Sequence, residues 1–225
     1  YLRDLNIGNI FKQSDREKDV FNFKWGHLCE EYIFKSGRLE GFINNNNEVN
    51  PTIFSSKNNF HCGTPDFYKI DDFGIVGDIK APVTLVGFYN LIFPIINGEK
   101  DGNKQIELIV NNSKESKKYY YQLISNAILL EEKLGVEFKK GILSSYMPYA
   151  HELKSIIEFA EANFTEYYSP ILSGTEKTLP CLLPSTDYEN LGEYFVNDLY
   201  HVEFDITTEM KTNFIKTLNE FTKLI

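Results

Sequence analysis

The sequence predicts an α/β domain in which helices flank a central mixed β-sheet. Hydrophobic residues recur first at helical spacing, then alternate, then return to helical spacing, in the order helix, several strands, helix, strand, helix. The 225 residues are 42% apolar and 15% aromatic, enough for one substantial core. We therefore expect a single domain over residues 1–225, with a core at about 14–165 and a C-terminal helical elaboration at about 176–225.

The first half of the chain is expected to supply a long helix and then most of the sheet. Trp25, Leu28 and Tyr32 recur at helical spacing and predict a helix over residues 15–36, which Gly37 would end. From residue 52 the hydrophobic period changes to two. Strands are expected at 52–55, 60–70 and 75–81, and the last two should form a hairpin.

The second half of the chain alternates helical and extended patterns. Helices are expected at residues 83–96, 116–134, 151–164 and 208–224. Strands are expected at residues 105–110 and 138–146. Gly135 should end the second of these helices, and residues 178–188, which contain two prolines, predict a loop.

Cysteine content and charge limit the class of protein. Cys29, Cys62 and Cys181 have no C-x-x-C spacing, which argues against a disulfide framework and excludes a four-cysteine metal site within one chain. No apolar stretch is long enough to span a membrane, so we expect a cytoplasmic protein, bacterial or in a virus-infected host cell. The net charge of −9 argues against a broadly basic nucleic-acid-binding surface, although a basic groove on one face remains compatible with it.

The stretch with the most chemical content runs from Cys62-Gly-Thr-Pro-Asp66 to Gly-Asp78-Ile79-Lys80. On a strand, Asp78 and Lys80 share one face and Ile79 points to the other. The carboxylate can hold a hard divalent cation, and the lysine can stabilise a developing oxyanion. A hairpin loop of three or five residues would align Asp66 with Asp78, whereas a loop of four would set them on opposite faces. The sequence leaves both registers open.

Two helices carry further candidate residues. Gly26 and Glu30 share a face of the first helix, and a glycine there costs about 1 kcal/mol relative to alanine, so we expect a close approach to the backbone. Glu30 is a candidate third acidic ligand, with Glu31 as its competitor. The second long helix begins with residues suited to phosphate contacts and packing, namely Lys117, Lys118, Tyr121 and Gln122. Each pattern alone is also typical of an ordinary helix surface.

In combination and order, these motifs resemble the PD-(D/E)XK nuclease superfamily. The chain is most similar to the branch of lambda-exonuclease-like (YqaJ-type) viral recombination nucleases, followed by the RecB-type nuclease domains. The matching segments lie between about residues 23 and 146: Gly26-x-x-x-Glu30, Gly63-Thr-Pro-Asp66, Asp78-Ile79-Lys80-Ala-Pro82 and Tyr120-Tyr121-Gln122. The chain departs from the pattern twice, because Asp78 replaces the commoner glutamate and Asn126 stands where a tyrosine is usual.

This resemblance implies a restriction-endonuclease-like core and a Mg²⁺- or Mn²⁺-dependent deoxyribonuclease, an exonuclease acting on linear DNA ends in recombination or repair. It implies that the side chains of Asp66, Asp78 and Glu30 and the backbone carbonyl of Ile79 hold the metal. Lys80 would orient and activate the attacking water. The substrate-binding residues would be Gln122, Lys118, Tyr121 and Lys117.

Two alternatives stay open at this point. One is a site-specific or structure-specific endonuclease of the same superfamily, and the other is a non-catalytic DNA-binding or assembly module that retains the fold. The expected partners are DNA, a single-strand annealing or recombination protein, and other copies of this chain in a homo-oligomer. No membrane partner is expected.

Overall fold

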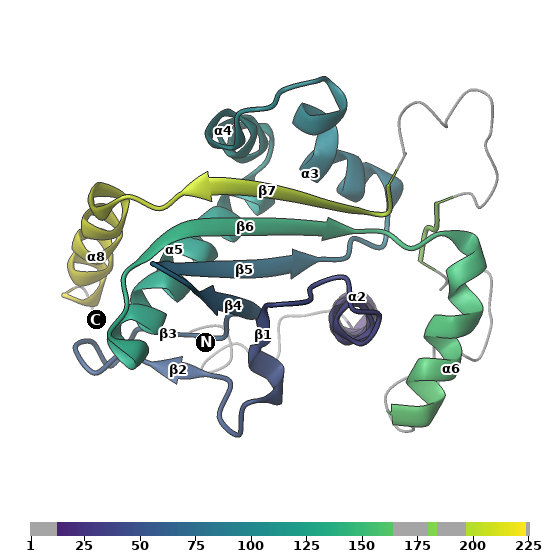
Figure 1. Cartoon of the computed structure of the whole chain (residues 1–225), viewed down its shortest axis with the longest axis horizontal. Coiled ribbons are helices and arrows are strands. Elements are labelled where there is room, and N and C mark those ends of the chain that lie inside the picture. Colours follow the sequence, from purple (N-terminus) through teal and green to yellow (C-terminus); the bar gives the residue numbers. More distant parts are fainter. Residues whose placement is uncertain (1–12, 164–179, 184–196, 224–225) are drawn as a thin grey trace.

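A computed structural model describes residues 13–163, 180–183 and 197–223 and has the expected α/β architecture (Figure 1). Its five-stranded sheet has the strand order β1-β4-β5-β6-β7. The strands β5 and β6 pair in parallel, and the other neighbours pair antiparallel, which makes the sheet mixed. The strands are β1 (Ile43–Asn44), β4 (Phe67–Ile70), β5 (Gly74–Lys80), β6 (Phe138–Tyr146) and β7 (Leu199–Asp205).

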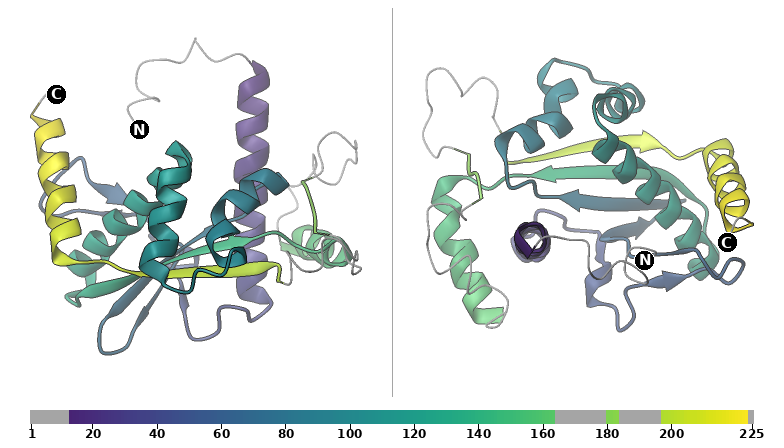
Figure 2. Two further views of the ribbon diagram at one scale, coloured as in Figure 1. Left: turned by 90° about the horizontal axis from the view of Figure 1, so that it is seen from above. Right: turned by 180° about the vertical axis from the view of Figure 1, so that it is seen from behind.

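Helices α3, α4 and α5 lie on one side of the sheet, and α2 extends from the level of the sheet to that same side (Figure 2, left). One apolar cluster joins the sheet to α3, α4 and α5, and a second joins it to α2 and α6. A two-stranded sheet of β2 (Ile53–Phe54) and β3 (Cys62–Gly63) packs against α5. The helices are α2 (Gln13–Lys35), α3 (Leu85–Ile96), α4 (Gly102–Asn112), α5 (Lys114–Leu134), α6 (Leu153–Asn163) and α8 (Thr208–Thr222).

Most elements with strong local signals form where the sequence predicts them. Helix α2 ends before Gly37, which has a positive φ of 75°, and α5 ends at Gly135, with φ of 70°. Strand β6 has the bounds expected from its pattern. The expected strand at 60–70 is instead divided into β3 and β4, because Pro65 between them has no amide hydrogen for a strand ladder.

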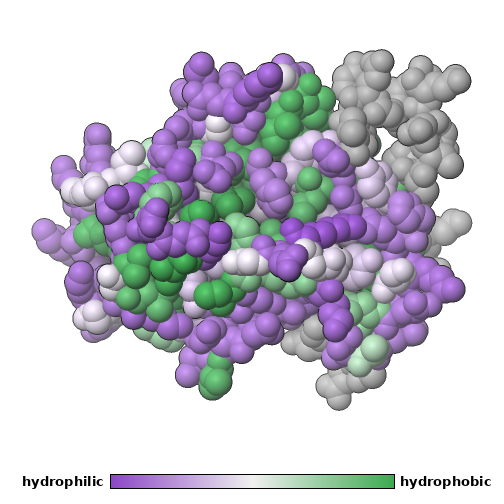
Figure 3. Space-filling view, viewed as in Figure 1, coloured by the Kyte–Doolittle hydropathy of each residue, from purple (hydrophilic) through white to green (hydrophobic). Residues whose placement is uncertain are grey.

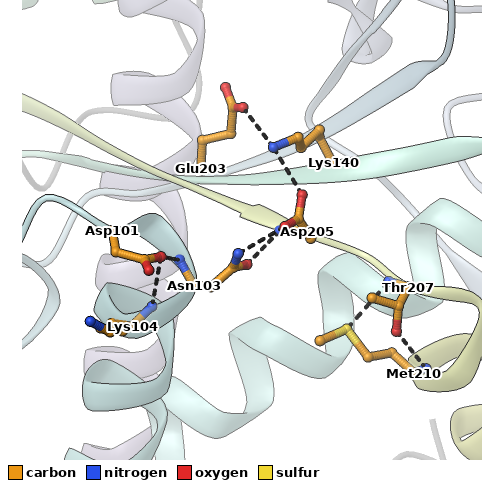
Figure 4. Close-up of polar contacts among 8 residues, drawn as sticks. All are labelled: Asp101, Asn103, Lys104, Lys140, Glu203, Asp205, Thr207 and Met210. Atoms are coloured by element: carbon orange, nitrogen blue, oxygen red, sulfur yellow. Dashed lines mark hydrogen bonds and ion pairs between the residues drawn. The ribbon is translucent and has the colours of Figure 1, made fainter.

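The prediction of a short strand at residues 105–110 is wrong, because this segment belongs to α4. The Asp101 side chain accepts hydrogen bonds from the backbone amides of Asn103 and Lys104 and so caps the helix (Figure 4). Asn103 also donates through Nδ2 to Asp205 Oδ2 on β7. A side chain at Gly102 would place its Cβ 1.7 Å from the Glu203 carbonyl oxygen, so α4 begins in direct backbone contact with β7.

Strand β7 lies in the region where the sequence predicted only a helical elaboration. Val202 and Phe204 are buried on one face, while on the other face Glu203 and Asp205 form ion pairs with Lys140 of β6 (Figure 4). The C-terminal segment therefore supplies a strand of the central sheet as well as α8. Most of the expected loop at 178–188, with the rest of 164–179 and 184–196, lies outside the described residues.

Hydrophilic side chains predominate on the face shown in Figure 3, with smaller apolar patches among them. Among the described residues, no helix combines the length and hydrophobicity that crossing a membrane requires.

The close packing of β4 on β5 gives a stability prediction. A Cβ at Gly77 would lie 1.9 Å from Phe67 Cζ, so we expect Gly77→Ala to lower the free energy of unfolding by about 2–3 kcal/mol through overpacking. Gly26→Ala, on α2, meets no atom within 4 Å and should raise it by about 1 kcal/mol. Urea denaturation measures both, and a Gly77→Ala protein as stable as the wild type would contradict the β4–β5 register.

Candidate functional site

The β4–β5 hairpin places Asp66 opposite Asp78. Phe67 pairs with Gly77, and residues 71–73 form a three-residue turn. Extending that antiparallel register by one residue sets the two aspartates against each other at the end of the hairpin. The turn is therefore one of those that align the two carboxylates, and the face they share is the one covered by α5.

Pro65 ends the hydrogen-bonded ladder at this point. By the same register it stands opposite Ile79, and it has no amide hydrogen to donate to the Ile79 carbonyl. The Ile79 amide donates instead to the Asp66 side chain, with 2.6 Å between N and Oδ2. The backbone carbonyl that the family resemblance implies as a metal ligand thus has no ladder donor on β4.

Asp78 is completely buried, and so is nearly all of Asp66. Lys80 Nζ lies 2.7 Å from Asp78 Oδ2, whereas Asp78 Oδ1 has no hydrogen-bond partner within the described part of the chain. Burial raises the pKa of Asp78, although Lys80 opposes this effect. Burial and the nearby Asp78 charge raise the pKa of Asp66 well above its ordinary range.

Lys80 is held as a cation by these two carboxylates. Burial alone would lower the pKa of Lys80, but Asp78 and Asp66 raise it above its ordinary value. At neutral pH the side chain is therefore an ammonium group, a hydrogen-bond donor rather than a base. Its Nζ also lies 4.8 Å from the ring centroid of Tyr119 on α5.

Helix α2 brings Glu30 near the two aspartates. Of the two glutamates considered from the sequence, Glu30 is the one whose charge contributes to the raised pKa of both Asp66 and Asp78. One of its carboxylate oxygens, Oε2, lies 3.8 Å from His27 Nδ1. Among the described residues, no three His, Cys, Asp or Glu side chains are close enough together to hold a metal ion. The oxygen atoms at the end of β5 therefore belong to the carboxylates of Asp66 and Asp78 and the carbonyl of Ile79, and Glu30 lies farther from them.

The face of α2 that carries Gly26 is open. Apart from the neighbouring residues and backbone of α2 itself, no atom of the described structure lies within 4 Å of the position that a Cβ would take there. The close approach expected from the sequence is therefore not made by another described part of this chain.

Helix α5 separates the four expected substrate-binding residues. Gln122 lies three residues after Tyr119 and so shares the face that contacts Lys80. Lys118 is exposed in an ion pair with Glu115.

Lys117 and Tyr121 lie on another face of α5, where they line a groove of about 650 Å³ between α5 and α8. The family motif pointed to Tyr120 and Tyr121 rather than to Tyr119. The spacing of three residues between Tyr119 and Gln122 could have predicted that Tyr119 shares the face of Gln122.

Asn126 occupies the position where the family pattern has a tyrosine, and it packs against the Gly63-Thr-Pro-Asp66 segment. A Cβ at Gly63 would lie 2.3 Å from Asn126 Oδ1, so any other residue at this point would displace a side chain of α5. Asn126 is buried, and neither polar atom of its side chain has a hydrogen-bond partner in the regions that the structure describes.

Comparison with known proteins gives no relative: no protein-family model matches the chain, and none of the curated proteins or solved structures matches it. The superfamily resemblance therefore stays a hypothesis based on the four motifs.

The atoms at the end of β5 fit a hard divalent cation. Within the described residues the candidate ligands are oxygen atoms of Asp66, Asp78 and the Ile79 carbonyl, and oxygen ligands are those that Mg²⁺ and Mn²⁺ prefer. Asp78 Oδ1 has no hydrogen-bond partner among the described residues, and the Asp78 charge disfavours ionisation of the buried Asp66; a bound cation would relieve both effects.

We predict that Asp66→Asn makes the metal-free protein more stable. Because folding raises the pKa of Asp66, the wild type loses stability as the pH rises through that raised value, and the amide variant avoids this loss. The difference in unfolding free energy should be small at acidic pH, where the carboxyl group is protonated in both states. At neutral pH it should reach about 1–2 kcal/mol.

Denaturation in the presence of a chelator, repeated across the pH range, measures this difference. Asp71→Asn is the matched control, since Asp71 is an exposed carboxylate in the turn of the same hairpin, paired with Lys69. A variant at Asp66 that is less stable than the wild type at every pH would show that the carboxylate is structural.

Proposed function

We propose that this protein is a metal-dependent deoxyribonuclease that hydrolyses phosphodiester bonds. The observation that carries the proposal is the pair of buried, mutually facing carboxylates with one ammonium group at the end of β5. An ion pair that only stabilises a fold needs one carboxylate for Lys80. The second carboxylate adds to the unfavourable free energy of burying charge, and a bound divalent cation would offset that free energy.

The side chains of Asp66 and Asp78, together with the Ile79 carbonyl, would hold Mg²⁺ or Mn²⁺. When bound, the cation would neutralise phosphate charge and lower the pKa of a coordinated water. Glu30 would complete the site or contribute to a second ion.

Lys80 would orient the attacking water and donate hydrogen bonds to the phosphate oxygens as negative charge develops on them. Its raised pKa supports the role of a fixed cation over that of a proton acceptor. Gln122 has both a donor and an acceptor group and would contact the substrate from α5.

The acidic balance of the chain is compatible with a DNA substrate. Part of the −9 charge lies at Glu30, Asp66 and Asp78, where bound metal would neutralise it. We propose linear DNA ends as the point of attack and recombination or repair as the setting, on the basis of the motif resemblance. Binding should be modest without divalent metal and strongly dependent on salt.

Removing either member of the ion pair at the site should strongly reduce activity. We expect Asp78→Ala and Lys80→Ala each to lower metal-dependent cleavage of linear duplex DNA by about 10²–10³-fold, because the first removes a ligand of the cation and the second removes a positive charge that stabilises the transition state. Lys69→Ala, which breaks a surface ion pair on the same hairpin, should retain full activity. Cleavage by the Asp78→Ala variant at the wild-type rate would refute the proposal. A wild-type protein that neither cleaves DNA nor binds Mn²⁺ in calorimetry would refute it as well.

The form of the DNA distinguishes the two kinds of nuclease. We expect the wild type to degrade a linearised plasmid with Mg²⁺ and to leave the closed circular form of the same plasmid intact, because an exonuclease needs an end. Gel electrophoresis of matched time courses measures both reactions. Equal cleavage of the two forms would identify an endonuclease instead.

A further inference from the structure

The Lys80 ammonium lies between two partners of different kinds. Asp78 Oδ2 is 2.7 Å from Nζ, and the ring centroid of Tyr119 is 4.8 Å from the same atom. Asp78 is on the same strand as Lys80, whereas Tyr119 is on α5, which covers that face of the sheet. The Lys80 side chain is only 20% exposed, so few other orientations are open to it.

These two partners respond differently to a bound cation. Asp78 is also a proposed metal ligand, and a carboxylate that shares its charge with a metal attracts an ammonium group less strongly. The face of an aromatic ring attracts the ammonium through its quadrupole, carries no net charge and offers no carboxylate to the metal. The contact between Lys80 and Tyr119 can therefore persist when Asp78 binds a cation.

We propose that Tyr119 is a positioning residue for the candidate nuclease, and that the face of its ring holds the Lys80 ammonium in place when Asp78 ligates the metal. The inference rests on the proposed function, and it assigns a role to a residue that the sequence motifs did not single out. The ring face carries the role, so the hydroxyl group of Tyr119 is dispensable for it.

The start of α5 fixes where this ring lies. Ser113 caps the helix by accepting a hydrogen bond from the Ser116 amide, and the buried Ser116 lies three residues before Tyr119. The neighbouring Tyr120 ring packs on Phe204 of β7, with 5.6 Å between ring centroids. Consecutive tyrosines thus have different environments, and the contact with Lys80 belongs to Tyr119.

Proton and carbon NMR of the full chain tests the contact without relying on cleavage. The ε-methylene signal of Lys80, assigned by its loss in Lys80→Arg, should be shifted upfield by the ring current of Tyr119, both with and without Mg²⁺. The shift should persist in Tyr119→Phe and disappear in Tyr119→Leu. An unshifted Lys80 signal in the Mg²⁺-loaded wild type would overturn the proposal.

Kinetics on linear duplex DNA test the consequence. We expect Tyr119→Leu to lower kcat about tenfold, equivalent to about 1.4 kcal/mol, with KM for DNA unchanged, and Tyr119→Phe to restore kcat to within about twofold. Tyr89→Leu is the control, because it makes the same change at a half-exposed tyrosine of α3 whose ring contacts Phe93. It should leave both constants unchanged.

Two kinetic outcomes would refute the role. If Tyr119→Phe is as impaired as Tyr119→Leu, the hydroxyl group matters and the ring face does not suffice. If Tyr119→Leu raises KM while kcat is unchanged, the residue contacts substrate rather than positioning Lys80. Failure of the proposed nuclease function is a separate result: the Lys80→Ala variant would then cleave DNA as fast as the wild type. In that case the NMR measurement still decides whether the ring holds the ammonium group.

Discussion

Burial of two facing carboxylates is the constraint on which the rest of this site depends. Asp66 and Asp78 lie in a low-dielectric environment that raises the pKa of both, and the Asp78 charge raises that of Asp66 further. The single positive charge of Lys80, 2.7 Å from Asp78, can balance only one negative charge. The three-residue turn aligns them, and α5 covers the face on which they lie. An arrangement that lowers the stability of the metal-free fold is expected at a functional site, because selection for packing alone would remove it.

Pro65 and β6 give this arrangement its rigidity and its open ligand atoms. Pro65 interrupts the ladder on one side of β5, so that the Ile79 amide binds the Asp66 side chain and the Ile79 carbonyl loses its ladder donor. On the other side, β5 stays paired with β6 through Lys80. Asp78 and Ile79 therefore lie at the end of a strand that stays paired with β6 but has lost its ladder on the β4 side, a suitable support for residues that must keep their geometry.

Helix α5 gives different environments to neighbouring residues. Tyr119 reaches Lys80, Tyr120 packs on β7, and Tyr121 faces the groove next to α8. One turn after Gln122, the buried Asn126 lies so close to Gly63 that a larger residue there would displace its side chain. The contact shows why the segment leading to Asp66 contains a glycine, a point that the motif alone left without a physical reason.

Local patterns in the sequence determined much of this protein, because capping, helical spacing and strand alternation act over a few residues. They were sufficient for α2, α5 and β6 and for the shared face of Asp78 and Lys80. Long-range packing decided the rest: the pairing of β7 with β6, the helical state of residues 105–110 and the approach of Tyr119 to Lys80. The register of Asp66 against Asp78 depended on the length of the turn between their strands. The alternation of side chains fixes which residues share a face within one strand, but it does not fix how that strand aligns with its neighbour. Only the folded chain could place these charges together, because their distances are set by contacts between segments far apart in the sequence.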